Sequence, residues 1–581
     1  MQEVSMEQKE NMLRMLLWQS GKLDSREFDA HRKFIFWVFA LGLTSISLNF
    51  RRNTENFLGL SVSGQDIFEV LRMLSVIAVF ADLALYIILH KFRRVHRAVK
   101  VFILGTGVLM SFTDLFTLYY WRTAFKSQML DIVLVSNFNE GFEFLESYLT
   151  DYGFLLFVAA VAATLFILYR LRKAMLVFIV IMITVSIQEI LMYPQIFTTF
   201  YFTPSNANYL GIGRIALMTQ EVREKMLKYK VLLDAKPQEV TLTRNDSSIP
   251  HTVFILGEAT ARHHMSLYGY DLPTTPNLLR RKHEGGLYVF SNVVSPHSYT
   301  IIVLEKLFNF YRYCEKGEWF TYTNLFSILR AAGCHTVWLS NQEVRPYYDP
   351  TTVYSGVCDY SGYVEAKYNW DSGKAYDAEL LPLLDNALKE STGKNFYVVH
   401  LMGCHNTYSR RYPPEYAKFT ASDETGGYDG ITESQKAHRA EYDNAELYND
   451  YVVDEIIRRF EDKNAIVIYV SDHGQEVYDE VNFASHGGER PYRHIIEVPF
   501  VIWTSPKFRE SYPELEARIA SSVNRPYMTD DMIHTVLDIM GIETPEYDPA
   551  KSIINPNFDS SRKRIYAGMQ YDKDTGLHEI Q

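Results

Sequence analysis

The sequence predicts a two-part fold, with an N-terminal five-helix transmembrane bundle and a C-terminal α/β domain that has a mostly parallel sheet. Three observations lead to this fold class. The first 193 of the 581 residues are dominated by long apolar runs, whereas the remainder is mixed and charged. In that remainder strand-like and helix-like patterns alternate, which is typical of a layered α/β domain. Residue types that bind metals follow several of the strand-like segments.

Five apolar runs make up the first part, and each approaches or exceeds the roughly 20 residues that a helix needs to cross a bilayer. They cover residues 33–50, 67–89, 99–121, 152–171 and 174–193. A buried core helix could explain one such run, but not five in succession. We therefore expect five transmembrane helices.

Basic residues in the short loops give the expected orientation, because cytoplasmic loops carry an excess of lysine and arginine. The loop after the second run and the loop after the fourth are both basic, with Lys91, Arg93, Arg94, Arg97, Lys100, Arg170, Arg172 and Lys173. Arg51 and Arg52, after the first run, oppose this assignment but are fewer. Five spans then place everything after Tyr193 on the outer face of the membrane.

Four segments follow from these boundaries. Residues 1–32 form a cytoplasmic segment without a signal-peptide pattern, and residues 33–193 hold the five spans. Residues 194–249 are an aromatic interfacial segment and a linker, and residues 250–581 form the α/β domain. The formal net charge of −11 argues against nucleic acid as a partner.

The four cysteines all lie in the second half of the chain and match no zinc-finger spacing; they are Cys314, Cys334, Cys358 and Cys404. Four cysteines allow three pairings, and the sequence does not choose among them. One or two disulfides are compatible with an extracytoplasmic domain.

Five strands are expected in the α/β domain, at 251–256, 336–339, 396–400, 466–470 and 498–503, with helices at 324–332 and 434–460 among others. The segment AIVIYVSDHG, residues 465–474, reads as a buried strand that ends in Asp472 and His473. The carboxyl ends of strands are where open α/β sheets place their sites, although Asp-His-Gly is also good turn chemistry. Glu258 ends the first strand, and with Asp472 and His473 it supplies three ligands typical of a catalytic zinc.

A hydroxyl group is expected beside these ligands. The segment SPHSYTI, residues 295–301, opens into a helical pattern, and Thr300 and Ser298 are the candidates. A helix start attracts phosphoryl groups, but spacing alone favours an ordinary N-cap.

Three histidines are further candidates. His400 lies at the end of an apolar strand, where a buried structural histidine is the simpler interpretation. His405 in the following loop, and His486 in a glycine-rich loop, are in positions suited to a ligand or a proton donor.

Taken together, the segments GEATARHHMSLYGYDLPTTPNL, SPHSYTI, HLMGCHNTY, SDHGQE and SHGG, after five apolar runs, resemble the lipid-linked phosphoethanolamine transferases. These enzymes belong to the alkaline-phosphatase and sulfatase superfamily and include the mobile colistin-resistance enzymes. The resemblance covers essentially the whole chain, and it is greatest to the branch associated with core lipopolysaccharide or other surface acceptors. It implies a sulfatase-like catalytic domain in the bacterial periplasm, joined to a multi-pass inner-membrane domain.

The resemblance also implies roles for individual residues. Thr300 would be the nucleophile, and Glu258, Thr300, Asp472 and His473 would bind Zn²⁺. His405 and His486 would bind a second zinc ion or the substrate phosphate. Ser136 and Glu140 resemble a pair that contacts the donor lipid, and Asn341 and Gln342 fall near a substrate-binding segment. The family often has glutamate directly after SDHG, whereas this chain has Gln475 and then Glu476.

The implied reaction moves phosphoethanolamine from phosphatidylethanolamine to lipopolysaccharide, on lipid A or a core sugar, or to another surface acceptor, through a covalent intermediate on Thr300. Three alternatives stay open. One is glycerol-phosphate transfer of the lipoteichoic-acid-synthase type. Another is a metal-dependent phosphodiesterase or sulfatase, although SPHSYTI lacks the sulfatase nucleophile pattern. The third is a membrane-anchored scaffold with a vestigial metal site.

Overall fold

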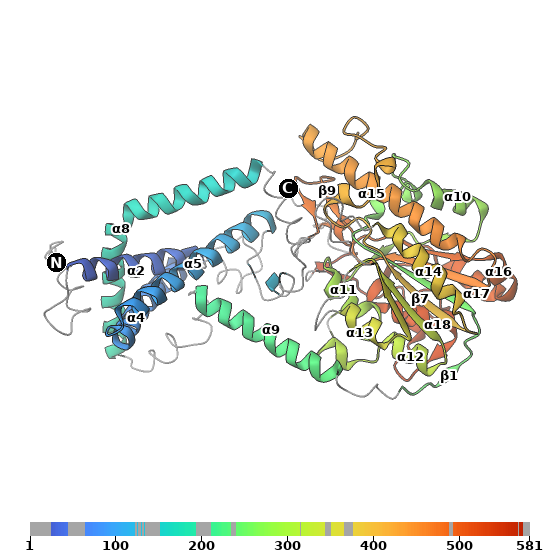
Figure 1. Cartoon of the computed structure of the whole chain (residues 1–581), viewed down its shortest axis with the longest axis horizontal. Helices are drawn as coiled ribbons and strands as arrows, with labels where there is room; N and C mark the ends of the chain where they lie inside the picture. The colour runs from blue at the N-terminus through green and yellow to red at the C-terminus, as the bar shows by residue number, and fades with distance from the viewer. Residues whose placement is uncertain are drawn as a thin grey trace. The chain divides into compact units, whose positions relative to one another are not determined.

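The computed structural model describes residues 25–44, 64–121, 125, 129–130, 133, 152–192, 211–233, 240–313, 315–342, 350–364, 376–486, 492–566 and 569–572 (Figure 1). The chain divides into two compact units, Met1–Glu224 and Lys225–Gln581.

The first unit is built of long apolar helices. They are α2 (Ser25–Thr44), α4 (Gly64–Leu89), α5 (Arg93–Trp121), α8 (Tyr152–Met192) and the first part of α9 (Gly211–Leu233). Helix α2 packs against α4, α5 and α8, and its buried residues Phe34, Ile35 and Phe39 share one core with Leu74 and Ile179. Large apolar side chains on the outer faces remain exposed, as a lipid environment allows.

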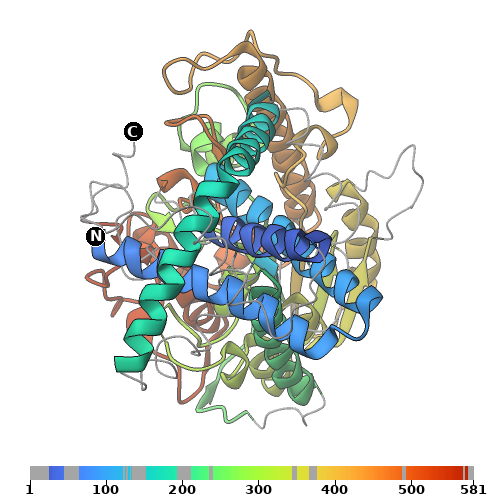
Figure 2. The same cartoon turned by 90° about the vertical axis from the view of Figure 1, so that its left-hand side faces the viewer.

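Among the described residues, three helical segments are long and apolar enough to cross a membrane: Leu71–Leu89, Arg93–Thr117 and Gly153–Thr184. The expected count of five separate helices is therefore not confirmed. The predicted loop between the fourth and fifth runs does not form, because α8 continues as one helix of 41 residues. Figures 1 and 2 show α8 as two stretches that meet at a sharp bend. Its length of about 60 Å would be roughly twice the thickness of a bilayer core.

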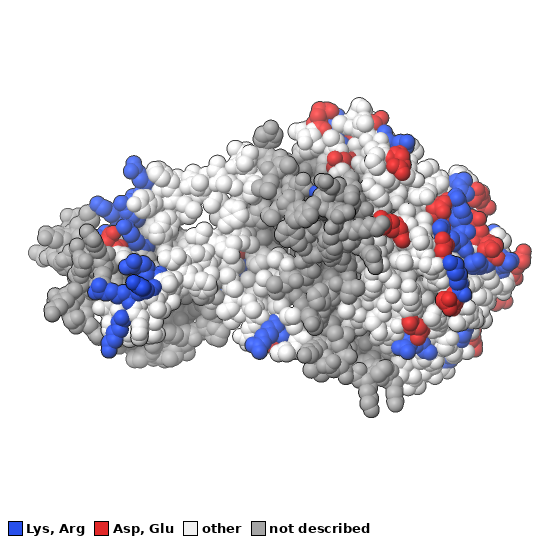
Figure 3. All heavy atoms as spheres, viewed as in Figure 1, with Lys and Arg blue, Asp and Glu red and all other residues white. Residues whose placement is uncertain are grey.

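Basic side chains gather at one end of this unit, whereas its middle is almost free of charge on the face shown in Figure 3. Lys91, Arg93 and Arg94 are exposed where α4 gives way to α5. Arg170 and Lys173 are also exposed, and the Arg172 guanidinium stacks 4.1 Å from the centre of the Tyr169 ring.

A seven-stranded sheet forms the centre of the second unit, in the order β3-β11-β8-β2-β7-β5-β6. The strands are β2 (His251–Gly257), β3 (Leu287–Val289), β5 (His335–Ser340), β6 (Tyr360–Tyr363), β7 (Asn395–His400), β8 (Ala465–Ser471) and β11 (Phe500–Thr504). The ladders among β8, β2, β7, β5 and β6 are parallel, but β11 is antiparallel to both β8 and β3. The sheet is thus mixed, which differs from the expected mostly parallel sheet by the direction of β11.

Helices cover both faces of this sheet, because alternate strand residues point to opposite sides. On one face Val253 and Ile255 pack with α10 (Pro276–Glu284), α14 (Leu380–Lys389) and α15 (Glu433–Arg458). On the other face the Phe254 ring lies 5.0 Å from the Phe308 ring, beside α11 (Thr300–Leu307), α12 (Leu325–Ala331) and α13 (Pro350–Val357). Figure 1 shows the resulting layers of helix, sheet and helix.

The remaining elements surround this core. They are α16 (Pro506–Ser511), α17 (Pro513–Ser522), α18 (Met532–Met540), and four pairs of short strands: β1 (Arg244–Asn245) with β13 (Ile542–Glu543), β4 (Val293–Val294) with β12 (Tyr527–Met528), β9 (Glu476–Val477) with β10 (Ala484–Ser485), and β14 (Ile565–Tyr566) with β15 (Met569–Gln570). The β1–β13 pair places the end of the predicted linker inside the second unit.

Candidate active site

Two neighbouring strands deliver the predicted metal ligands to one point. β2 and β8 are parallel and pair Gly257 with Ser471, so the residues that follow each strand meet at the same edge. Nε2 of His473 lies 3.2 Å from Oε1 of Glu258 and 3.4 Å from Oδ2 of Asp472. Glu258, Asp472 and His473 are at most 1% exposed.

Thr300 joins this cluster from the start of α11. Its Oγ1 lies 3.1 and 3.3 Å from the two carboxylate oxygens of Glu258 and 3.4 Å from Nε2 of His473. Tyr299 is the N-cap of α11, so the Thr300 hydroxyl does not cap the helix. The other hydroxyl candidate, Ser298, is buried, and its Oγ has no hydrogen-bond partner among the described residues.

The cluster is electrostatically unusual because two carboxylates are buried side by side. Among the described residues, no lysine or arginine forms an ion pair with Glu258 or Asp472. Burial and the charge of Glu258 raise the pKa of Asp472 to about 7. Burial lowers the pKa of His473, but the neighbouring Asp472 and Glu258 outweigh it and raise that pKa to about 9. Burial would raise the pKa of Glu258, yet its hydrogen bond with His473 keeps that pKa below the usual value.

The backbone beside Glu258 is held in a rare conformation. Ala259 has a φ of 53°, in the left-handed region that side-chain-bearing residues seldom occupy. Its N–H donates to Oδ1 of Asp472 at 3.2 Å, and its carbonyl accepts from the Tyr442 hydroxyl at 2.7 Å. Gly403 packs closely here, since a Cβ would lie 2.5 Å from the Glu258 carbonyl oxygen. Such strain persists only where the surroundings impose it, and it is concentrated at functional sites.

His486 and His405 stand next to the cluster. The His486 ring lies 4.1 Å from the His473 ring and 6.3 Å from the His405 ring. Burial and the neighbouring His473 and His405 hold the pKa of His486 well below its usual value. His400 instead lies in the core, with Nδ1 3.1 Å from Oγ of Ser340.

Asn341, which was predicted to bind substrate, forms a hydrogen bond within the protein: its Nδ2 donates to Oδ1 of Asp377 at 2.7 Å. Its neighbour Gln342, which the resemblance places in the same substrate-binding segment, instead donates from Nε2 to Oε2 of Glu258 at 3.2 Å. No local sequence pattern predicts that a neutral amide will contact a metal-binding carboxylate in this way. Ser136 and Glu140 lie outside the described residues.

The residues after SDHG have separate partners. Oε1 of Gln475 accepts from Nδ1 of His486 at 2.7 Å, whereas Oε2 of Glu476 lies 2.9 Å from Nδ1 of His494. Glu476, Asp479 and His494 form a second group of potential ligand atoms. That group is already neutralised, because Asp479 is paired with both His264 and Arg439.

Three cysteines are free thiols: Cys334, Cys358 and Cys404. The Cys404 thiol is buried and donates to Oε2 of Glu446 at 3.1 Å. Cys314 lies outside the described residues.

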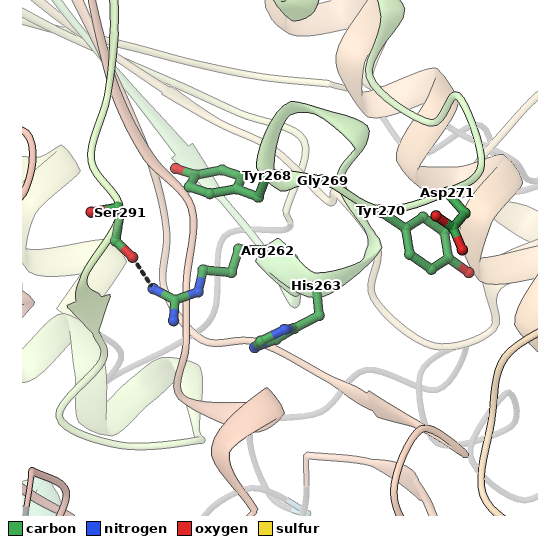
Figure 4. A pocket seen from close by; sticks show the side chains of 7 residues that line it. All are labelled: Arg262, His263, Tyr268, Gly269, Tyr270, Asp271 and Ser291. Atoms are coloured by element: carbon green, nitrogen blue, oxygen red, sulfur yellow. Dashed lines mark hydrogen bonds between the residues drawn. The ribbon is translucent and has the colours of Figure 1, made fainter.

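A cavity of about 440 Å³ lies beside His263, whose ring is 4.2 Å from that of His494. Its lining residues are Arg262, His263, Tyr268, Gly269, Tyr270, Asp271 and Ser291 (Figure 4). Arg262 donates to the Ser291 carbonyl and to Glu497, and the Tyr270 hydroxyl donates to Asp443. Most of its polar groups are therefore already paired within the protein.

The Glu258–Thr300–Asp472–His473 cluster fits a zinc ion. Carboxylate oxygens and an imidazole nitrogen are ordinary zinc ligands, and the threonine hydroxyl occupies the position that catalytic sites leave for water or substrate. Oδ2 of Asp472 is buried without a hydrogen-bond partner among the described residues. Buried carboxylate oxygens are normally hydrogen-bonded, so this oxygen is suited to bind a cation.

Comparison with known proteins agrees with this geometry. Residues 250–542 match the sulfatase family. The chain is 29% identical over 503 residues to the phosphoethanolamine transferase EptC of Escherichia coli O18:K1:H7, which covers 82% of this chain and 86% of that protein.

Two solved structures are also similar. The C-terminal periplasmic domain of Escherichia coli EptC, in complex with zinc, is 31% identical, with a TM-score of 0.54 over 59% of this chain and 100% of that domain. The integral membrane protein lipooligosaccharide phosphoethanolamine transferase A of Neisseria meningitidis has a TM-score of 0.57 at 21% identity, covering 89% and 97% of the two chains. That second likeness shows a shared fold. From the matched family and these relatives, the chain belongs to the sulfatase family, in the branch of the phosphoethanolamine transferases.

Proposed function

We propose that this protein transfers phosphoethanolamine from phosphatidylethanolamine to lipopolysaccharide, on lipid A or a core sugar, or to another surface acceptor. The observation that carries the proposal is the position of Thr300. Its hydroxyl lies at the start of a helix, 3.1 Å from Glu258 and 3.4 Å from His473, inside a buried cluster of metal-binding side chains. A hydroxyl in such a place is a nucleophile rather than a helix cap.

The first half of the reaction forms a covalent intermediate. Oγ1 of Thr300 loses its proton and bonds to the donor phosphorus, while the bond from phosphorus to the glycerol oxygen breaks. The glycerol oxygen takes up a proton and leaves as diacylglycerol. In the second half an acceptor hydroxyl or phosphate oxygen attacks the same phosphorus, and the Thr300 oxygen is released.

The remaining side chains have supporting roles in this proposal. Glu258, Thr300, Asp472 and His473 would hold the zinc ion, which when bound would lower the pKa of a hydroxyl group and offset charge on phosphoryl oxygens. His405 and His486 are placed to contact the phosphate, a second zinc ion, or the protons of the leaving and attacking groups. Ser136 and Glu140 remain proposed contacts to the donor lipid, and Asn341 remains a proposed substrate-binding residue.

The membrane part fits a lipid donor. We infer a multi-pass protein of the bacterial inner membrane with its catalytic unit in the periplasm. Helix α8 is long enough for two of the five expected spans. Its basic residues, like those of the α4–α5 turn, are expected on the cytoplasmic side.

Lipid turnover by the zinc-loaded, full-length protein in detergent tests the function. We expect diacylglycerol release from a fluorescent phosphatidylethanolamine, and no release by the near-isosteric variant Thr300→Val. Release from phosphatidylglycerol instead would favour glycerol-phosphate transfer. Free phosphoethanolamine without transfer to any acceptor would favour a phosphodiesterase. No turnover of either lipid would favour the scaffold.

A further inference from the structure

Each histidine at the site has its Nδ1 beside an oxygen atom. Nδ1 of His473 lies 2.7 Å from the carbonyl oxygen of Gly474, and Nδ1 of His405 lies 2.8 Å from that of Asn406. A backbone carbonyl only accepts hydrogen bonds, so both rings carry a proton on Nδ1. In a neutral ring this leaves Nε2 with a free lone pair, the arrangement typical of metal-binding histidines.

His486 achieves the same arrangement by a different route. Its Nδ1 faces Oε1 of Gln475, a side-chain amide, at 2.7 Å. An amide can present either its oxygen or its NH₂ group, and the two choices give opposite tautomers of the histidine. If the oxygen faces the ring, Nε2 is unprotonated; if the NH₂ faces it, Nε2 carries the proton.

The neighbours of Gln475 on its other side favour the first choice: Oδ1 of Asn406 can only accept a hydrogen bond, whereas the Tyr408 hydroxyl fits either orientation of the amide. Nε2 of Gln475 donates to the Tyr408 hydroxyl at 2.6 Å and lies 3.4 Å from Oδ1 of Asn406. Gln475 and Tyr408 are both fully buried, so water does not compete for these bonds. The Tyr408 ring is itself held between the rings of Tyr442 and His438, at 5.0 and 4.7 Å.

We propose that Gln475 is a positioning residue: held by Tyr408, it accepts the Nδ1 proton of His486 and so keeps Nε2 of His486 unprotonated. This inference rests on the proposed function for its catalytic consequence. An unprotonated Nε2 can bind zinc or take a proton from an attacking hydroxyl, whereas it cannot donate a hydrogen bond to a phosphate oxygen. The assignment therefore gives His486 the role of ligand or base. It also accounts for a neutral residue where related enzymes often have glutamate, since an amide orients the ring without adding a charge.

The tautomer can be measured without any turnover. Full-length, zinc-free protein labelled with ¹⁵N-histidine is reconstituted in liposomes and examined by solid-state NMR at neutral pH. The His486 signals are identified by their loss in His486→Ala. We expect a protonated Nδ1 and an unprotonated Nε2 in the wild type, and a mixture of tautomers in Gln475→Met, which keeps the length of the side chain but not its acceptor. A wild-type His486 that carries its proton on Nε2 would overturn the inference.

Kinetics test whether Gln475 acts through His486. Gln475→Met should lower kcat for diacylglycerol release by about 10- to 100-fold, the usual effect of removing the partner of a ligating histidine. Gln475→Glu, which retains an acceptor, should recover most of that loss. In a His486→Ala background, Gln475→Met should have no further effect, whereas a merely structural role would make the two losses multiply. Wild-type activity in Gln475→Met, or multiplying losses, would refute the inference. A wild type that releases no diacylglycerol would refute the proposed function instead, and the NMR result would then decide the inference alone.

Discussion

Nε2 of Gln342 donates a hydrogen bond to Oε2 of Glu258 and a second one to the carbonyl oxygen of Leu401, each at 3.2 Å. Gln342 follows β5 and Leu401 follows β7, so the amide ties the Glu258 carboxylate to the ends of two further strands. A carboxylate fixed in this way loses little freedom when it binds a metal ion. Gln342 thus fixes a proposed zinc ligand to the ends of β5 and β7.

Removing this amide should weaken zinc binding. Gln342→Leu keeps the bulk of the side chain but leaves Glu258 free to rotate, and we expect zinc affinity to fall by about 10- to 100-fold. The measurement is competition between full-length protein and a chromophoric chelator. The same change in the capping box of α15, Gln435→Leu, should leave zinc affinity unaltered. Equal affinity in the wild type and Gln342→Leu would contradict this role.

Stability should depend on pH through His264. This ring is fully buried between Asp443 and Asp479, with Nδ1 2.5 Å and Nε2 3.0 Å from their oxygens. Burial lowers its pKa, but the two carboxylates outweigh burial and raise it from 6.5 to about 10. Because the folded pKa is raised, charged His264 stabilises the fold fully below pH 6.5, and the contribution is lost as the pH rises through about 10.

His264→Gln isolates this contribution. Near pH 6.5 the substitution should destabilise the fold by roughly 3–5 kcal/mol, because it leaves the buried Asp443 carboxylate without its cation, whereas Asp479 keeps Arg439. Near pH 10 the difference in Tm between wild type and variant should shrink. This difference in Tm is measured by thermal unfolding of the detergent-solubilised wild type and variant at both pH values. A difference that is constant with pH would show that His264 is not charged in the fold.

A buried ion pair connects the start of α9 to α5, and we expect it to stabilise the first unit. Arg214 of α9 pairs with Asp114 of α5, and the same guanidinium donates to the carbonyl of Phe125. Arg214→Ala leaves the buried Asp114 carboxylate without its cation, and we expect the free energy of unfolding to fall by roughly 3–5 kcal/mol.

The matched double variant Asp114→Leu/Arg214→Met removes both charges and should recover most of that loss. Tryptophan fluorescence during heating in detergent reports the unfolding midpoint of each variant. A double variant as unstable as Arg214→Ala would argue that the two residues do not act as a pair.

The sequence predicts those parts of the site that depend on strand ends. Hydrophobic runs predicted β2 at 251–256 and β8 at 466–470, and the structure has them at His251–Gly257 and Ala465–Ser471. Because β2 and β8 are adjacent and parallel, the residues that follow them, Glu258 and Asp472, lie close together. The direction of β11 was not predictable in this way, because an apolar run carries no information about strand direction.

Other features depend on contacts between distant segments. The resemblance drew attention to Gln342 and Gln475, but their contacts with Glu258 and His486 could not be predicted, because the partners lie on distant strands and loops. The basic residues Arg170, Arg172 and Lys173 predicted a loop, yet a helix satisfies its own backbone hydrogen bonds whatever its side chains. The charges there are accommodated by exposure and by stacking of Arg172 on Tyr169. Charge alone therefore did not break α8.

The most direct test of the account is the intact mass of the full-length protein after incubation with phosphatidylethanolamine and zinc, with acceptor omitted. The account predicts that the mass rises by one phosphoethanolamine group, that fragmentation places the group on Thr300, and that Thr300→Val shows no increase. Diacylglycerol release without any adduct, or an adduct that persists in Thr300→Val, would contradict Thr300 as the nucleophile.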